Sequence, residues 1–190
     1  DKWDVELRTA LTALVSNHTS LGYNTGRDRM FENVDLQPGD TIECVYTGKK
    51  IKAATRTIAQ NLGFNTEHTW PQSFFSENEP MRSDIFHLYP TDATPNNVRA
   101  NYDFGKVVSG ITYEVGGSKL GKNYLNQTVF EPRDVHKGDV ARSLFYFVTR
   151  YTDLGGYLDT LQQSVLRQWN KFDTVSTREY ARNGKIAQYQ

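Results

Sequence analysis

The chain has a single cysteine, Cys44, among its 190 residues, so no disulfide can form within it. It has no run approaching the roughly 18 apolar residues that a membrane-spanning helix needs, and its start lacks the basic-then-apolar order of a signal peptide. Its formal net charge is zero, which excludes attraction of the whole molecule to a polyanion. Together, these absences indicate a globular protein that is stabilised by packing. We expect Cys44 to lie in the core, within a strand.

Material for a core is plentiful, because 37% of the residues are hydrophobic and 13% are aromatic. At this length we expect one domain spanning residues 1–190. The charge is unevenly distributed: residues 1–43 hold four Lys/Arg against eight Asp/Glu, and residues 44–190 hold 18 against 14. The basic clusters near residues 49–56, 133–150 and 178–185 are interpreted first as a solvated surface.

Hydrophobic spacing predicts three helices and two short strands. Apolar residues at spacings of three and four predict helices over 3–15 and 140–152, with another at 159–171. Alternation predicts a strand in residues 40–48, and IFHLYP predicts a second one that Pro90 stops. The expected fold class is α+β, a mostly helical single domain with a small antiparallel sheet.

The stretch FNTEHTWPQSFF, residues 64–75, contains the one Glu-His step, Glu67-His68. In a regular strand these two side chains would point to opposite faces, which does not suit a shared site. Pro71 restricts Trp70 to extended geometry and cannot donate a ladder hydrogen bond. We therefore expect the Glu-His step at the irregular end of a short strand or in a loop, where both side chains can converge.

A second polar stretch, MRSDIFHLYPTDATPNNVRANYDFG, supplies Asn96 and Arg99, one helical turn apart, after a helix start at Thr94-Pro95. Glu67 and Asn96 offer hard oxygen ligands, and His68 offers an imidazole with a pKa suited to proton transfer. These are the parts for metal-assisted attack on a phosphodiester. Taken alone, the residue types are common, and a structural role for His68 is the default interpretation.

The order and spacing of the motifs resemble those of a known protein family. NTEHTWPQSFF, the second polar stretch and VFEPRDVHKGDVARSLFYFVTRY resemble the successive signatures of the bacterial endonuclease I family, nonspecific nucleases of the His-Me finger (ββα-metal) type. HTSLGYN, CVYTG and LRQWNKFDTVSTREYARN are also similar to the family's usual run. The resemblance implies an embedded ββα-metal finger at about residues 64–104.

The resemblance also implies roles for single residues. His68 would be the general base, oriented by a backbone carbonyl near residues 82–84, and Glu67 and Asn96 would be the metal ligands. The implied cofactor is Mg²⁺, with Ca²⁺ or Mn²⁺ as substitutes. Cleavage would leave 5′-phosphate and 3′-hydroxyl ends.

The sequence allows two interpretations for each of two arginines. Arg142, on an apolar helix, pairs with a carboxylate such as Glu131 or holds a phosphate, and the phosphate role is the prediction. Arg99 has the same choice and is included among the catalytic candidates. The remaining assignments are these: an orienting role for Asp84, a structural one for His87, a surface one for His136, and Arg82 as a doubtful phosphate clamp.

The expected function is a secreted or periplasmic, metal-dependent endonuclease with little sequence specificity. It would act on DNA and RNA as a monomer without a membrane partner, in a mature form whose signal peptide has been removed. Two alternatives remain open: an RNA-preferring nuclease or other phosphodiesterase on the same finger, and a non-catalytic nucleic-acid-binding domain.

Overall fold

The computed structural model describes residues 2–152 and 157–190. The helices are α1 (Asp4–Ser16), α2 (Tyr23–Arg29), α3 (Arg56–Asn61), α4 (Ala93–Arg99), α5 (Lys137–Arg150), α6 (Thr160–Phe172) and α7 (Thr177–Ile186). Short helical turns of other types are η1 (Met30–Val34), η2 (Gln72–Phe75), η3 (Met81–Ser83), η4 (Ile85–His87) and η5 (Asp134–His136). The strands are β1 (Thr41–Glu43), β2 (Lys50–Lys52), β3 (Phe64–His68), β4 (Leu88–Asp92), β5 (Ser109–Val115), β6 (Ser118–Lys122) and β7 (Thr128–Glu131).

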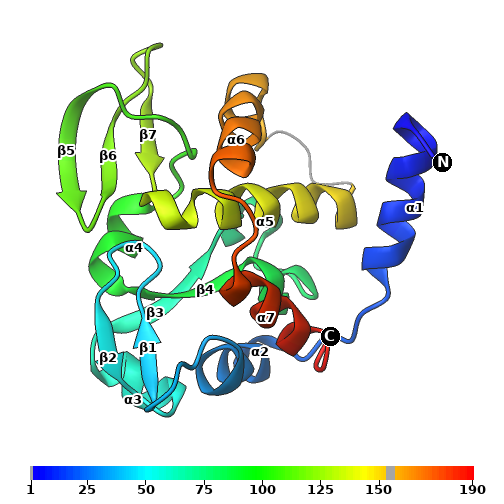
Figure 1. Cartoon of the computed structure of the whole chain (residues 1–190), viewed down its shortest axis with the longest axis vertical. Coiled ribbons are helices and arrows are strands. Elements are labelled where there is room, and N and C mark those ends of the chain that lie inside the picture. Colours follow the sequence, from blue (N-terminus) through cyan, green and yellow to red (C-terminus); the bar gives the residue numbers. More distant parts are fainter. Residues whose placement is uncertain (1, 153–156) are drawn as a thin grey trace.

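The strands form three small antiparallel sheets, which confirms the α+β class. The sheets are β1-β2, β3-β4 and β5-β6-β7. In the middle sheet Glu67 pairs with Tyr89 and His68 with Leu88, so β3 ends at the Glu-His step as expected. Figure 1 shows β5, β6 and β7 projecting from one end of the molecule, while β3 and β4 lie beneath the long helix α5.

The core lies around α5, whose apolar face was predicted. Val140, Leu144 and Phe147 are completely buried. Trp70, which follows β3, stacks on Phe147 with ring centroids 5.1 Å apart, so α5 covers the segment that leads out of the Glu-His step. This packing fixes the end of β3 against the largest helix of the fold.

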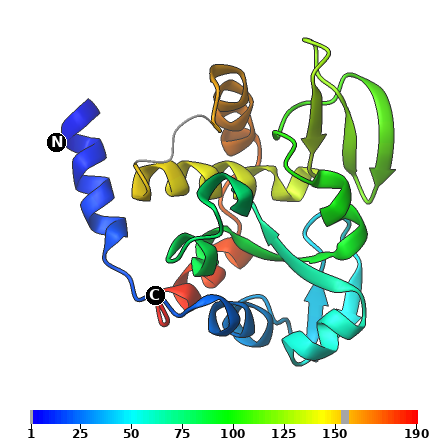
Figure 2. The ribbon, with the colours of Figure 1, turned by 180° about the vertical axis from the view of Figure 1, so that it is seen from behind.

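Helix α1 has the predicted period but no buried side chain. It stands to one side of the body beside the end of α5, as the two opposite views show (Figures 1 and 2). Thr12 donates to the carbonyl of Thr149, and Arg150 donates to the carbonyl of Val15 and to the ring of His18. Polar contacts with the last turn of α5 therefore contribute to holding α1.

Several local predictions were wrong. Pro90 lies inside β4, opposite Thr66, because β4 is one strand of a two-stranded sheet and tolerates a missing donor. The segment Ile85–His87 is a helical turn that precedes the strand. Cys44 is buried as expected but follows β1, and the cap of α4 is Asp92, which accepts from the amide of Thr94.

Some cations of the basic clusters pair with acids in the front of the chain, while others, such as Lys49 and Lys50, are about half exposed, in line with a solvated surface. Arg182 of α7 forms a buried ion pair with Asp35, 3.0 Å between Nε and Oδ1. Arg178 and Arg133 both contact Glu43, at 3.0 and 3.1 Å. Acidic residues of the front of the chain thus pair with cations that lie far behind them in sequence.

In the described part of the chain, no helix combines the length and apolar character required to cross a bilayer.

Candidate active site

A polar pocket of about 110 Å³ lies where β3 ends against α4. Its lining includes Glu67 and His68 from the end of β3 and Asn96 and Arg99 from α4. Both Glu67 and His68 line the pocket, although they occupy successive positions of the regular β3–β4 ladder, which corrects the expectation of an irregular strand end. The strand stops after His68, where Thr69 donates to the carbonyl of His87 and the chain turns into Pro71.

The ring of His68 is held by the main chain. Its Nε2 lies 3.3 Å from the carbonyl oxygen of Arg82, within the segment where that carbonyl was expected, although η3 carries it and not a strand. A carbonyl can only accept, so Nε2 carries the proton and Nδ1 of the neutral ring keeps its lone pair. Nδ1 makes no hydrogen bond within the described residues.

The surroundings keep His68 neutral. Burial is the main cause that lowers the pKa of His68 to about 3. The hydrogen bond to the Arg82 carbonyl opposes this fall in the pKa, and the positive charges of Arg82, Arg27 and Arg99 add to it. The side chain is 6% exposed, at the wall of the pocket. A neutral imidazole with one nitrogen fixed and the other unpartnered has the form that a general base requires.

Glu67 is buried and incompletely satisfied. Its Oε1 lies 3.3 Å from Nη1 of Arg99 but has no hydrogen-bond partner in the described chain. Burial raises the pKa of Glu67, and the charge of Arg99 opposes the rise. Glu67 is among the residues that line the pocket, and a carboxylate is a ligand that hard divalent cations prefer.

Asn96 is oriented by its amide nitrogen. Nδ2 donates to Oδ1 of Asn65 at 2.8 Å and to the carbonyl of Thr66 at 3.3 Å. Both partners are on β3, so the strand fixes the amide and leaves Oδ1 as the atom without a protein partner. Glu67 and Asn96 therefore supply one carboxylate and one amide oxygen to the same pocket, a donor set that fits a hard, water-rich divalent cation. No cluster of three or more His, Cys, Asp or Glu residues suited to a metal was found in the described residues.

Arg99 links α4 to the end of β3 through buried contacts. Its guanidinium is 2% exposed and donates to the carbonyls of His68 and Thr69 and to the hydroxyl of Tyr157. The ion pair to Glu67 completes its contacts on β3. With its donors directed at main-chain carbonyls and the Tyr157 hydroxyl, Arg99 has the structural pairing that was one of its two interpretations, and we assign it a positioning role.

The structure places Arg142 elsewhere. It does not line the pocket, and its Nε and Nη2 each donate to a carboxylate oxygen of Glu179 on α7, both at 2.5 Å. The predicted carboxylate partner was also wrong, because Glu131 pairs with Lys137 at 2.6 Å. The phosphate role of Arg142 is therefore not proposed further.

The remaining candidates have structural contacts. Asp84 accepts from the hydroxyls of Tyr146 and Tyr151, both at 2.9 Å. His87 is completely buried, with Nε2 2.7 Å from the carbonyl of Met81. His136 is buried and paired with Asp139 at 3.1 Å, so the surface role predicted for it was wrong.

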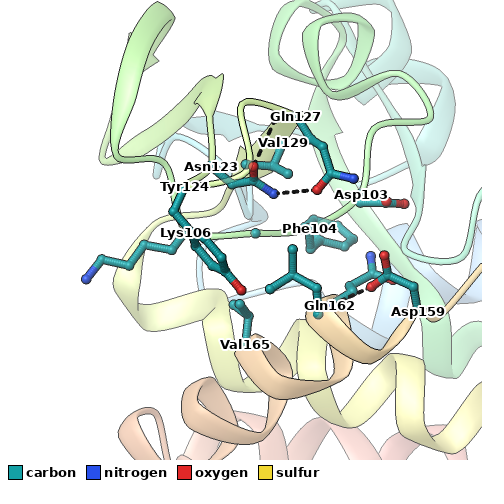
Figure 3. Close-up of a pocket in the computed structure, with 12 residues that line it drawn as sticks. Asp103, Phe104, Lys106, Asn123, Tyr124, Gln127, Val129, Asp159, Gln162 and Val165 are labelled. Atoms are coloured by element: carbon teal, nitrogen blue, oxygen red, sulfur yellow. Dashed lines mark hydrogen bonds between the residues drawn. The ribbon is translucent and has the colours of Figure 1, made fainter.

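Other pockets lack this chemistry. The one in Figure 3 lies between the β5-β6-β7 sheet and α6 and holds about 30 Å³, roughly the share of one water molecule. Its polar groups are mostly occupied, as Asn123 contacts Gln127 and Asp159 caps α6 through the amide of Gln162. A larger pocket of about 700 Å³ between α1 and α5 has a mixed lining, with apolar side chains such as Trp3 and polar ones such as Arg8, and none of the described residues that line it is a histidine.

Sequence reasoning missed one neighbour of His68. The ring of Tyr23, on α2, lies 5.6 Å from the imidazole between centroids, and Arg27 of the same helix packs on it. Nothing in local spacing connects α2 with β3. The only signal was HTSLGYN, which ends just after Tyr23 and was noted as similar to the family's run.

Comparisons with known proteins show the family of the chain. The Endonuclease I family matches residues 4–190. An extracellular ribonuclease of Bacillus subtilis (strain 168) and one of Bacillus amyloliquefaciens are each 33% identical over 198 residues, covering 93% of this chain. An extracellular deoxyribonuclease of Aeromonas hydrophila is 26% identical over 110 residues, covering 58% of this chain. The matches span 65% of the length of each Bacillus protein and 47% of the Aeromonas protein. The match over nearly the whole chain shows that the protein belongs to the endonuclease I family.

Proposed function

We propose that the chain is an extracellular, metal-dependent endonuclease that hydrolyses phosphodiester bonds in DNA and RNA with little sequence specificity. The observation that carries the proposal is the pocket that a neutral, carbonyl-held His68 shares with the carboxylate of Glu67 and the amide of Asn96. The names of the relatives, two ribonucleases and a deoxyribonuclease, all extracellular, support the substrate class and the location.

His68 acts as the general base. Its Nδ1 takes a proton from a water molecule as the oxygen of that water bonds to phosphorus, and the bond from phosphorus to the 3′ oxygen breaks. The leaving oxygen takes a proton from solvent, which gives 3′-hydroxyl and 5′-phosphate ends. The Arg82 carbonyl holds the imidazolium that forms, because Nε2 donates to it throughout.

Glu67 and Asn96 would hold a divalent cation, and we propose Mg²⁺, for which Ca²⁺ or Mn²⁺ could substitute. Such an ion, when bound, offsets negative charge on the transition state and the leaving oxygen. Two protein ligands leave further positions on the ion for water and phosphate, as is usual for Mg²⁺. Arg99 keeps the carboxylate and the end of β3 in register with α4.

Substrate recognition is directed at the backbone. Contacts to phosphate and sugar carry no sequence information, which accounts for action on both nucleic acids. Arg82, whose carbonyl holds the base, also presents a half-buried guanidinium next to the pocket, and we assign it a phosphate contact. The enzyme would act as a monomer. A preference for RNA is the second candidate, favoured by the names of the two Bacillus relatives.

The test is cleavage of plasmid DNA and of an RNA of similar length with Mg²⁺ and with EDTA. We expect both to be cut only with the metal, and His68→Ala to lower the rate about 10²- to 10⁴-fold while DNA binding persists. A fully active His68→Ala variant would end the mechanism. Binding without cleavage by the wild-type protein would favour a non-catalytic domain, and cleavage of RNA alone would favour the second candidate.

A further inference from the structure

Helix α2 lies outside residues 64–104, the range expected for the finger. It places the positive charge of Arg27 near His68, in addition to the charge of Arg82. Its Tyr23 contacts the imidazole at 5.6 Å, and two guanidiniums lie over the ring of that tyrosine: Arg27 at 3.9 Å and Arg82 at 4.2 Å from the ring centroid. One aromatic side chain thus carries two cations beside the proposed base. Stacking fixes the plane of each guanidinium and leaves edge donors for another partner.

Arg27 differs from the other buried or half-buried arginines of the fold in its partners. Seven of those each pair with a carboxylate: Arg56, Arg82, Arg99, Arg133, Arg142, Arg150 and Arg182. Arg27 has no carboxylate oxygen within 4.0 Å in the described chain, and its charged group donates only to Oδ1 of Asn24, at 2.7 Å.

The two stacked guanidiniums also have unused donors. Nε of Arg27 and Nε of Arg82 are buried without a hydrogen-bond partner. Burial lowers the pKa of Arg27, and the nearby charges of Arg56 and Arg82 lower it further. Two like charges on one ring, only one of them paired with an acid, the half-exposed Glu77, form an arrangement that an anion would stabilise.

We propose that Tyr23 and Arg27 form a subsite for a backbone phosphate next to the scissile one, so that a nucleic acid strand crosses from the pocket onto α2. Arg27 supplies a charge-assisted contact to that phosphate, and Tyr23 aligns Arg27 with Arg82 so that two successive phosphates are held. The proposal deepens the proposed function and rests on it. It assigns to α2 a role in binding, not in the chemical step.

The test compares Arg27→Ala with Arg29→Ala, which removes the same charge from the same helix. Arg29 is exposed, and its guanidinium lies over Tyr189, 5.1 Å from that ring. On a single-stranded oligonucleotide we expect Arg27→Ala to raise KM about 10- to 100-fold with a smaller change in kcat. Arg29→Ala should stay close to the wild type.

Two further measurements separate binding from a structural effect. On the His68→Ala background, oligonucleotide affinity should fall with Arg27→Ala, and the slope of log affinity against log salt should become less steep by about 0.7. On bis(p-nitrophenyl) phosphate, which has no neighbouring phosphate, the loss caused by Arg27→Ala should be much smaller than on the oligonucleotide. Tyr23→Leu, which keeps both charges but removes the platform, should raise KM in the same direction.

Equal losses on the short and the long substrate would overturn the subsite, as would an Arg27→Ala variant that matches Arg29→Ala in KM and salt slope. Either result leaves the proposed function intact as long as the wild-type protein cleaves nucleic acid. Absence of metal-dependent cleavage by the wild type would instead overturn the proposed function itself.

Discussion

Nη1 of Arg99 lies 3.3 Å from Oε1 of Glu67, and each side chain is only 2% exposed. The proposed metal-binding carboxylate is thus linked to the helix that carries the second ligand, Asn96. Glu67 gains a counter-charge in a site where burial raises its pKa, so the pocket keeps an ionisable carboxylate that solvent barely reaches.

Replacement of Arg99 should therefore be costly. Arg99→Leu removes one partner of a buried ion pair and leaves Glu67 uncompensated, so we expect a loss of about 3–5 kcal/mol in the free energy of unfolding. Urea titration of the variant, with Arg29→Leu as the exposed control, measures the loss. Equal unfolding midpoints for the two variants would show that the pair contributes nothing.

Asn96 should determine the Mg²⁺ concentration that cleavage requires. Asn96→Ala removes the proposed amide ligand, and we expect the Mg²⁺ concentration for half-maximal cleavage to rise about 10- to 100-fold, the range found when even a supporting group of a metal site is lost. Asn97→Ala, an exposed neighbour that does not line the pocket, is the matched control. A Mg²⁺ titration identical for both variants would exclude Asn96 as a ligand.

Arg142 should affect stability and not catalysis. Loss of its paired hydrogen bonds to Glu179 in Arg142→Ala should cost about 1–3 kcal/mol. Cleavage by the folded variant should stay near the wild-type rate. A double-mutant cycle with Glu179→Ala measures the coupling, and a large fall in activity without destabilisation would restore the phosphate role for Arg142.

Acid should weaken the fold partly through His18. Burial, followed by the charge of Arg150, lowers the pKa of His18 from 6.5 to about 4. The unfolded chain then binds a proton that the folded chain does not, so stability falls as pH decreases from about 6.5 to about 4. Urea titrations across this range should show a smaller loss for His18→Gln, and parallel curves would contradict the assignment.

Patterns confined to one segment were predictable from the sequence. Helix α5 followed from its apolar spacing, because a helical period fixes which neighbours share a face. The selection of Glu67, His68 and Asn96, and of a carbonyl near Arg82, depended on the resemblance of the ordered motifs to the endonuclease I family.

Contacts between side chains that are far apart in the sequence were not predictable. Arg142 had several carboxylates within reach of a plausible fold, and only the docking of α7 selects Glu179 over Glu131. His136 looked exposed because its neighbours in sequence are charged, yet α5 and η5 bury it. Tyr23 meets His68 across 45 positions of sequence, and no periodicity encodes such a contact.

The group that holds the ring of His68 belongs to the main chain. Every amino acid at position 82 brings the same oxygen, so sequence drift there can vary the charge offered to a substrate without disturbing the tautomer of the base. A change at position 82 would therefore alter the charge offered to a substrate and, through that charge, the pKa of His68, but it would keep the carbonyl that selects the tautomer of the proposed base.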